Sequence, residues 1–376
     1  HVKRFDSIRP YTDSEVQGVL QELSINKDVI NAFISSSKYK IFLNLPFAYF
    51  VISKILQNKI KTIHTVKDYQ SIFEDLVANM IKTKTAGFEC NGFSNIEENK
   101  AYLYISNHRD IAIDPALLNY MLHQNNYKTT NIAVGNNLMN EAWASDLMRL
   151  NKSFIIDRTG KSKREIYQGL TLASEYIEDS LLDKQEPIWI AQKQGRAKDG
   201  IDETDPALLK MIHLNNRKTS DIDGFFNSLS FVPVAVSYEF DPNDIYKANE
   251  IFALQMQNEY IKSDREDLNS IANGISGYKG LVTLTIGETI NFTENSYEAC
   301  AQLITQTILS LYKLQPSNFA ACEILNISHT LSHDFSDNKI KFAKEYLINR
   351  SKDLEPGIRE LLLKQYSNPV LQKEKL

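Results

Sequence analysis

Residues 101–118 read AYLYISNHRDIAIDPALL, an apolar run that ends in a group of polar residues and is followed by a second apolar stretch. The run AYLYIS is typical of a short buried strand. Asp114-Pro115 is typical of a helix start, because Asp can cap a helix and Pro fits its first turn. The stretch therefore predicts a strand, a polar turn and a helix. The turn holds Asn107, His108, Arg109 and Asp110.

The same texture of short apolar runs and amphipathic stretches continues through the middle of the chain. Helices are expected over residues 115–123, 163–182 and 245–262, where apolar residues recur at helical spacing. Strands that alternate with helices predict an α/β fold with a mixed, largely parallel sheet and helices on both faces. Five further strands are predicted, at residues 130–135, 153–157, 187–191, 231–236 and 281–287.

Helical periodicity also marks both ends of the chain. Apolar residues recur at helical spacing over residues 13–23 and 66–81, and again over 339–350 and 356–365. The texture changes near residues 90 and 297, so we predict three domains. These are an N-terminal helical domain (1–90), an α/β domain (91–296) and a C-terminal helical extension (297–376).

The charge balance excludes one class of partner. The 376 residues include 42 Lys and Arg against 47 Asp and Glu, a net charge of −5. A general nucleic-acid binder needs a basic surplus for its phosphate contacts, so no nucleic-acid partner is expected. Cys90, Cys300 and Cys322 show no C-x-x-C spacing, so neither a disulfide framework nor a metal site is predicted.

The longest apolar segment is IFLNLPFAYFVISKIL, residues 41–56, which Asn44 and Pro46 interrupt. It is too broken for a spanning helix, which needs about 20 apolar residues. We favour a buried core helix. The alternative is a segment that rests in a bilayer interface, where aromatic residues settle and Lys can snorkel. With no apolar secretory segment at the charged start, we expect a cytoplasmic protein, with peripheral contact at the inner face of the membrane through residues 41–56 as the alternative.

His108 is the candidate catalytic base. Two carboxylates follow it closely, Asp110 and Asp114. A carboxylate that accepts a hydrogen bond from one ring nitrogen leaves the other free as a base. Such a pair can deprotonate an alcohol for attack on an acyl carbonyl. The same H-R-D opens a protein-kinase catalytic loop, but Pro115 stands where the metal-binding Asn should be, and no Gly-rich loop or D-F-G is present.

Two other predicted strands end in basic residues, and in open α/β sheets the chemistry collects at such ends. Arg158 follows the run at 153–157. Each of the two basic segments, after residues 157 and 191, fits a solvated loop on its own, but the two together suit the binding of a phosphate monoester. Gly lets a backbone approach a ligand closely, and an Arg guanidinium matches phosphate oxygens in a bidentate way. The run at 187–191 is followed by Lys193, Gly195, Arg196 and Lys198.

These motifs together resemble the glycerolipid acyltransferases, which include bacterial lysophosphatidate acyltransferases and soluble plastid glycerol-3-phosphate acyltransferases. The first motif of that family is N-H-x-x-x-x-D. Asn107, His108 and Asp114 match it in order, although five residues instead of four separate the His from the Asp. The longer spacing leaves Asp110 as an alternative residue to orient His108.

The other three family motifs follow in the same order. Residues 154–158 match the second motif, an apolar strand that ends in Arg, and residues 232–234 match the fourth, an apolar run around Pro. Residues 190–196 match the third, with Gln194 where many members have Glu. The resemblance covers about residues 100–240, and the flanking parts match nothing as firmly.

The resemblance implies the transfer of a fatty acyl group from acyl-CoA or acyl carrier protein to a hydroxyl of glycerol-3-phosphate or 1-acylglycerol-3-phosphate, in phospholipid biosynthesis. It implies no metal, no cofactor and no covalent acyl-enzyme. His108 would be the general base and Asp114 would hold its tautomer. The acceptor phosphate would be bound by Arg158, Lys193, Gly195, Arg196 and Lys198.

A second function fits the same motifs. The changed spacing between His108 and Asp114, together with Gln194, favours a non-catalytic protein that binds a lysophospholipid or phosphoester on the same scaffold. The two hypotheses differ in one observable, the release of a free thiol from an acyl thioester.

Overall fold

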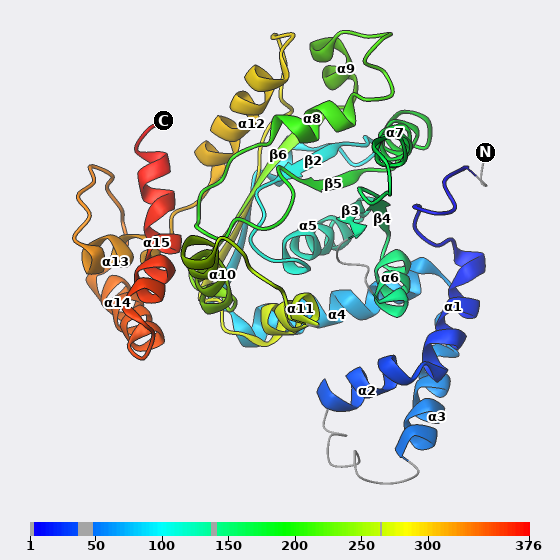
Figure 1. Ribbon diagram of the computed structural model, residues 1–376, viewed down its shortest axis with the longest axis horizontal. Helices are drawn as coiled ribbons and strands as arrows, with labels where there is room; N and C mark the ends of the chain where they lie inside the picture. The colour runs from blue at the N-terminus through cyan, green and yellow to red at the C-terminus, as the bar shows by residue number, and fades with distance from the viewer. Residues whose placement is uncertain (1–3, 37–47, 137–140, 264) are drawn as a thin grey trace. The chain divides into compact units, whose positions relative to one another are not determined.

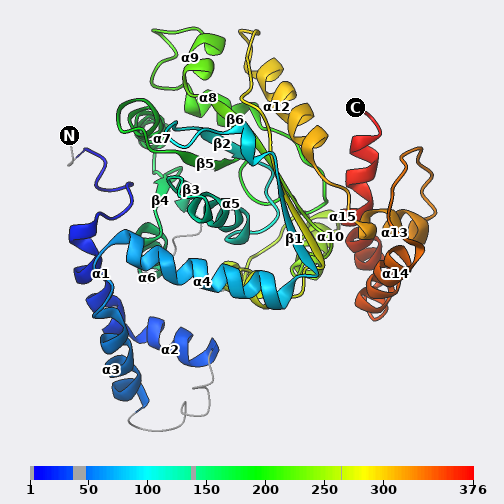
Figure 2. The same cartoon turned by 180° about the vertical axis from the view of Figure 1, so that it is seen from behind.

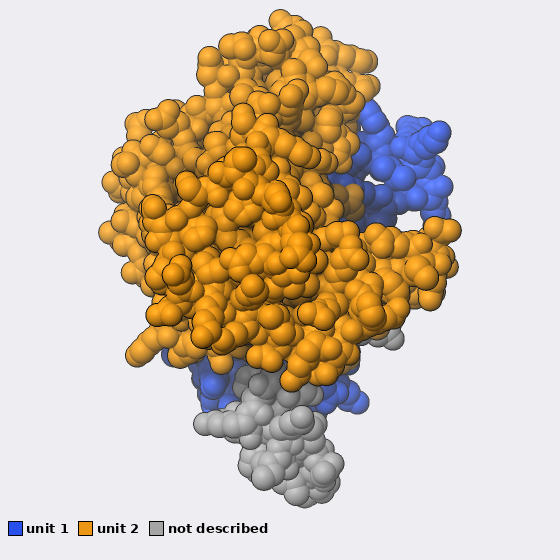
Figure 3. All heavy atoms as spheres, turned by 90° about the vertical axis from the view of Figure 1, so that its left-hand side faces the viewer, with its two compact units in different colours: residues 1–76, 131–176 blue, residues 77–130, 177–376 orange. Residues whose placement is uncertain are grey.

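The strand predicted before His108 is present as β2 (Leu103–Ser106). The computed structural model describes residues 4–36, 48–136, 141–263 and 265–376. They form two units, which Figure 3 colours blue and orange: residues 1–76 with 131–176, and residues 77–130 with 177–376. The predicted boundaries at residues 90 and 296 remain a prediction about independently folding domains.

The second unit contains five strands in the order β1-β7-β6-β2-β5. Only β6 and β7 are antiparallel within this set, and the other neighbours are parallel, so the sheet is mixed and largely parallel. Leu103 of β2 lies opposite Ile188 of β5 and Phe231 of β6. Besides β2, the strands are β1 (Gly87–Asn91), β5 (Ile188–Ala191), β6 (Phe231–Tyr238) and β7 (Leu281–Ile286).

Helices cover both faces of this sheet. Every residue of β2 and β6 is buried, as expected for strands that are covered on both sides. Figure 1 shows α8 (Pro206–Ile212) and α12 (Tyr297–Leu311) on one side of these strands and α5 (Ile113–Gln124) on the other. The predicted α/β fold is therefore confirmed. Three further helices of this part are α9 (Ile222–Ser228), α10 (Asp244–Gln257) and α11 (Glu266–Ser276).

The predicted C-terminal helical region is also present. It continues from α12 into α13 (Pro316–Leu325), α14 (Asp337–Ser351) and α15 (Pro356–Lys373). These last three helices lie side by side in Figures 1 and 2. With Phe240 and Ala248 they enclose a core of buried side chains that includes Phe319, Leu347 and Leu362. This packing ties the end of the chain to α10 and to Phe240, which follows β6.

The described residues of the first unit form mainly helices, together with the strands β3 (Asn131–Gly135) and β4 (Ser153–Ile156), which pair in parallel. The predicted helix at residue 13 begins there because Glu15 Oε2 accepts from the backbone N–H of Thr12 at 2.7 Å, a capping box. The helices of this part are α1 (Asp13–Ile25), α2 (Lys27–Ser36), α3 (Ala48–Ile60), the first half of α4 (Val66–Lys84), α6 (Ala142–Leu150) and most of α7 (Lys163–Glu178).

The apolar segment at 41–56 lies partly outside the described residues, which resume at 48. Its second half forms α3, on which Ile52 is buried while Phe50 and Val51 are 64% and 50% exposed. One side of α3 is thus buried, and the other side is exposed. In the described part of the chain, no helix combines the length and the apolar composition that crossing a membrane requires.

Candidate active site

His108 follows β2 by two residues, and its Nδ1 lies 2.8 Å from Oδ2 of Asp114. The Asp114 side chain is completely buried, whereas the His108 ring keeps 13% of its surface exposed. An ionised carboxylate only accepts hydrogen bonds, so Nδ1 carries the proton and Nε2 carries the lone pair. Nε2 has no hydrogen-bond partner among the described residues. The geometry is that of a base oriented by a buried carboxylate.

The ring of His108 is also fixed by packing. It meets Trp189 of β5 edge to face, with ring centroids 5.5 Å apart and an interplanar angle of 69°. Trp189 is buried in the neighbouring strand. The two strands that meet at this point thus determine both the position and the tilt of the imidazole.

The extra residue between His108 and Asp114 is absorbed by a turn. Oδ2 of Asp114 accepts from the backbone N–H groups of Arg109, at 2.6 Å, and Asp110, at 3.0 Å, in addition to the imidazole. The chain therefore wraps around the carboxylate before the helix begins. Five intervening residues are compatible with a direct contact between the two side chains.

The predicted capping role of Asp114 is wrong. The helix α5 begins at Ile113, so Asp114 is its second residue and its side chain turns back to the loop. Asp110 takes the capping role instead, because its Oδ1 accepts from the N–H groups of Ala112, at 3.0 Å, and Ile113, at 2.9 Å. Asp110 makes no hydrogen bond to His108, so the orienting contact comes from Asp114.

Asp110 gives a pH-dependent stability prediction. Burial, with a further contribution from the charge of Asp114, raises its pKa from 3.8 to about 6. The native state therefore takes up this proton near pH 6 and the unfolded state only near pH 4, so ionised Asp110 destabilises the fold at neutral pH. Asp110→Asn keeps the capping oxygen, and we expect it to raise the free energy of unfolding at pH 7.5 by about 3 kcal/mol. The gain should disappear as the pH falls to about 4.

Urea unfolding at several pH values measures this effect. Asp205→Asn is the matched control, because Asp205 is an exposed capping residue whose Oδ1 accepts from the N–H of Ala207. The control should show no gain that depends on pH in this range. Equal stability of Asp110→Asn and the wild type at pH 7.5 would contradict the expected cost of ionised Asp110.

Asn107 and Arg109 lock the loop to its surroundings. The Asn107 amide exchanges two hydrogen bonds with the backbone of Val236 in β6, at 2.8 and 3.0 Å. The buried Arg109 guanidinium forms a bidentate pair with Asp202, at 2.5 and 2.7 Å. It also lies against the ring of Tyr312, 5.5 Å from the centroid. Arg109 is thus a structural cation that is already paired.

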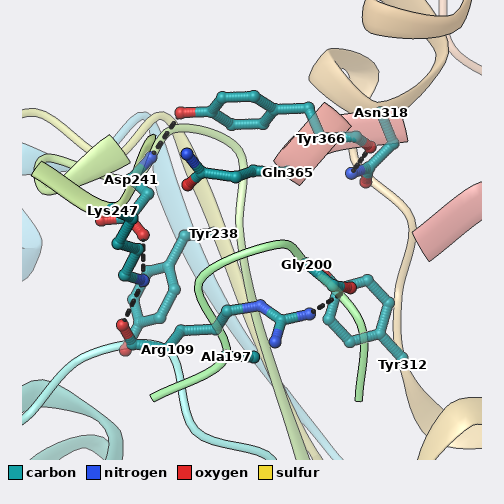
Figure 4. A pocket seen from close by; sticks show the side chains of 10 residues that line it. All are labelled: Arg109, Ala197, Gly200, Tyr238, Asp241, Lys247, Tyr312, Asn318, Gln365 and Tyr366. Atoms are coloured by element: carbon teal, nitrogen blue, oxygen red, sulfur yellow. Dashed lines mark hydrogen bonds and ion pairs between the residues drawn. The ribbon is translucent and has the colours of Figure 1, made fainter. Parts of the chain in front are cut away.

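A small cavity lies behind the loop (Figure 4). Its volume is about 30 Å³, which suits one or two water molecules but not a phosphoester. The buried Lys247 of α10 donates from Nζ to the carbonyl of Arg109 at 2.6 Å and pairs with Asp241. Burial lowers the pKa of Lys247, while the carboxylate of Asp241 opposes that shift. The cavity is therefore a polar support for the loop and is too small to be the binding site for a phosphoester.

The basic loop after β5 contacts the His108 loop directly. The N–H of Ala197 donates to the carbonyl of His108 at 2.8 Å. Gly195 has a φ of +78°, a conformation that favours glycine, and its surroundings are open. Lys193 and Arg196 form no hydrogen bond or ion pair with the described residues. The loop that contacts His108 therefore carries two cationic side chains, and neither forms a hydrogen bond or ion pair with the described residues.

The other two predicted cations are placed differently. Lys198 forms an ion pair with Glu250 of α10, and both side chains are largely buried. Arg158 belongs to the first unit, where it follows β4 and is half-buried. Beside it, Asp157 Oδ1 accepts from the backbone N–H of Thr159 at 2.8 Å, which orders that strand end. Phosphate binding by Arg158 and Lys198 remains a prediction.

The sequence did not reveal three residues that hold the site. Asp202, Tyr238 and Lys247 contact the loop at separations of 93, 124 and 138 positions along the chain from their partners. No local motif surrounds them. Tyr238 ends β6, so extending the rule of polar strand ends to that strand could have indicated it, whereas Asp202 and Lys247 give no such signal.

Comparison with known proteins identifies the central segment. Residues 87–200 match the family model described as Acyltransferase, which confirms the resemblance seen in the motifs. The matched segment contains His108, Asp114 and the basic loop at 193–198. No curated protein matches the chain significantly.

One similar solved structure is the crystal structure of the 1-acyl-sn-glycerophosphate (LPA) acyltransferase, PlsC, from Thermotoga maritima. It has a TM-score of 0.40 and 11% sequence identity, over 84% of this chain and 100% of that chain.

Proposed function

We propose that this chain is an acyltransferase of lipid synthesis that moves a fatty acyl group from acyl-CoA or acyl carrier protein to a hydroxyl of glycerol-3-phosphate or 1-acylglycerol-3-phosphate. The observation that carries the proposal is the hydrogen bond between Nδ1 of His108, just after β2, and the buried carboxylate of Asp114 in α5. The acyltransferase match over residues 87–200 supports the type of reaction. It leaves the donor and the acceptor open.

The reaction needs one base and no covalent intermediate on the protein. Nε2 of His108 takes the proton of the acceptor hydroxyl as the oxygen attacks the thioester carbonyl. A C–O bond forms, the C–S bond then breaks, and the proton passes from the imidazolium to the departing thiolate. The products are an ester and a free thiol. Asp114 keeps the required tautomer and stabilises the imidazolium, which is the role of the carboxylate in hydrolase triads.

The acceptor's anionic group is expected at the loop after β5. Lys193 and Arg196 carry positive charge next to the His108 loop, and Gly195 leaves open space for close approach of a ligand. A phosphate monoester suits this arrangement, because its oxygens accept charge-assisted hydrogen bonds. In this proposal Lys198 belongs to the same phosphate site and is shared between Glu250 and the ligand.

The exposed surface of α3 suits contact with a membrane, which would hold a lipid acceptor. Tyr49, Phe50 and Val51 are exposed there, within the segment that the sequence singled out for interface contact. Aromatic and aliphatic side chains of this kind settle at the boundary of the headgroups. In this proposal the protein makes peripheral contact with a membrane through the exposed residues of α3.

The proposal is tested with purified protein, one acyl-CoA and a panel of acceptors. Free thiol and ester product should form with a glycerol phosphate acceptor and not with glycerol alone. Binding of a lysophospholipid without any thiol release would replace the enzyme by the non-catalytic binding protein. Repeating the panel with acyl carrier protein as donor identifies the natural thioester.

Arg196→Ala should mainly weaken acceptor binding. Hydrogen bonds to a charged group contribute about 1.5–3 kcal/mol, so we expect the acceptor KM to rise about 10- to 100-fold with a smaller change in kcat. The KM for the acyl donor should stay constant. Steady-state thiol release at varied acceptor concentration measures these values.

The control is Lys341→Ala, which removes an exposed cation from α14. It separates the loss of a specific contact from the loss of one positive charge on the protein. An acceptor KM that is unchanged in Arg196→Ala would remove Arg196 from the proposed phosphate site.

A further inference from the structure

Asp114 has two carboxylate oxygens, and they have different partners. Oδ2 accepts from the imidazole and from two backbone N–H groups of the loop. Oδ1 accepts from a single described group, the hydroxyl of Tyr238, at 2.7 Å. Tyr238 is the last residue of β6 and lies beyond the segment 87–200 that matches the acyltransferase model.

The Tyr238 hydroxyl is suited to be a permanent donor. Burial raises its pKa well above the ordinary value, and the nearby charge of Asp114 adds to this effect. The hydroxyl therefore stays protonated at any pH at which the protein works. Donating to Asp114 also satisfies an oxygen that would otherwise be buried without a partner, which is costly for a charged group.

The position of the Tyr238 ring is itself fixed. Its backbone pairs with Val282 of β7, and the side chain lines the small cavity behind the loop (Figure 4). Lys247 lines the same cavity and donates a hydrogen bond to the carbonyl of Arg109. The loop that bears His108 is thus held from behind by residues of β6 and α10.

We infer that Tyr238 is a positioning residue for the His108–Asp114 pair: its hydroxyl fixes the plane of the Asp114 carboxylate so that Oδ2 faces Nδ1. This inference deepens the proposed function, and its kinetic consequences rest on that function. Without the donor, the carboxylate can rotate and its charge is less dispersed. The charge then attracts the imidazolium more strongly, and His108 is protonated at a higher pH.

Tyr238→Phe removes only the hydroxyl. We expect kcat to fall about 10-fold with both KM values unchanged, as the loss of one charge-assisted hydrogen bond would predict. The acidic limb of the pH profile of kcat/KM should move to higher pH by about half a unit. A purely structural role for Tyr238 would lower activity without moving that limb.

Tyr127→Phe is the matched control. Tyr127 belongs to the same unit, and its hydroxyl donates to the carbonyl of Ile96, away from Asp114. This variant should leave the acidic limb in place. Replacing Tyr238 by 3-fluorotyrosine keeps the shape of the ring and strengthens the donor, so it should move the limb to lower pH even if Tyr238→Phe folds poorly.

A second measurement does not depend on activity. NMR of protein labelled at histidine, with the His108 signal assigned through His108→Gln, reports the Nδ1 proton and the midpoint of the ring titration. In Tyr238→Phe the midpoint should rise, and an unchanged midpoint in a folded variant overturns the inference. If the wild type transfers no acyl group while the midpoint still shifts, the proposed function fails and the positioning role stands.

Discussion

His108→Gln should lower kcat/KM for acyl transfer by about 10³-fold, because a positioned general base contributes roughly 10²- to 10⁴-fold. Gln is polar and of similar size, and its amide can donate to Oδ2 of Asp114 in place of Nδ1. The fold should therefore be preserved. Thiol release gives the activity, and circular dichroism with urea unfolding checks the fold. His64→Gln, at an exposed position of the first unit, serves as the control for the loss of a histidine.

Two carboxylate variants show which residue orients His108. Asp114→Asn keeps an oxygen for the two backbone N–H groups but removes the negative charge that stabilises the imidazolium, and we expect a loss of similar size to that of His108→Gln. Asp110→Asn retains the oxygen that accepts from the N–H groups of Ala112 and Ile113, so activity should change by a few fold at most. The reverse order of losses would assign the orienting role to Asp110. Full activity of His108→Gln would remove the mechanism altogether.

The sheet was predictable because its central strands are buried on both faces. Their sequences are continuous apolar runs, and all six predicted runs form strands. The strand β1 has the sequence GFECN and lies at the edge of the sheet, with no residue fully buried. A half-exposed strand of this kind has neither a continuous apolar run nor a clean alternation, so the sequence did not indicate it.

Helix ends were less predictable than helix existence. The helix predicted over 245–262 ends at Gln257, because Asn258 adopts a left-handed conformation that closes it. The helix predicted over 356–365 continues to Lys373 through Pro369, which is buried among its neighbours. Proline normally ends a helix, so the continuation reflects tertiary packing that overrides the local signal.

The residues proposed to react in the candidate site were more predictable than those that hold them. His108 and Asp114 lie in one motif, and the structure places them in contact. Their supports, Tyr238, Asp202 and Lys247, come from distant segments whose local sequence has no distinctive pattern. A catalytic group must be of a particular chemical type, whereas a support must only reach one atom, and that depends on the fold.

The ion pair between Arg109 and Asp202 should have the largest single effect on stability. Both side chains are buried, and they are joined by two hydrogen bonds. Removing either partner leaves an uncompensated charge inside the protein, so Arg109→Met and Asp202→Leu should each cost about 3–5 kcal/mol of unfolding free energy. The double variant removes both charges and should recover most of that loss.

Asp202 also explains why the C-terminal helix matters for this loop. The side chain of Gln372 in α15 accepts from the N–H of Asp202 at 2.7 Å and donates to its carbonyl at 3.0 Å.

Urea unfolding of the wild type, both single variants and the double variant gives the coupling energy between Arg109 and Asp202. The exposed pair Lys364–Glu360 is the control, and its removal should cost less than about 1 kcal/mol. If the buried and exposed pairs cost the same, Arg109 is not held by Asp202 in the way the structure indicates, and the loop that carries His108 must be fixed by its other contacts, such as those of Asn107 and Lys247.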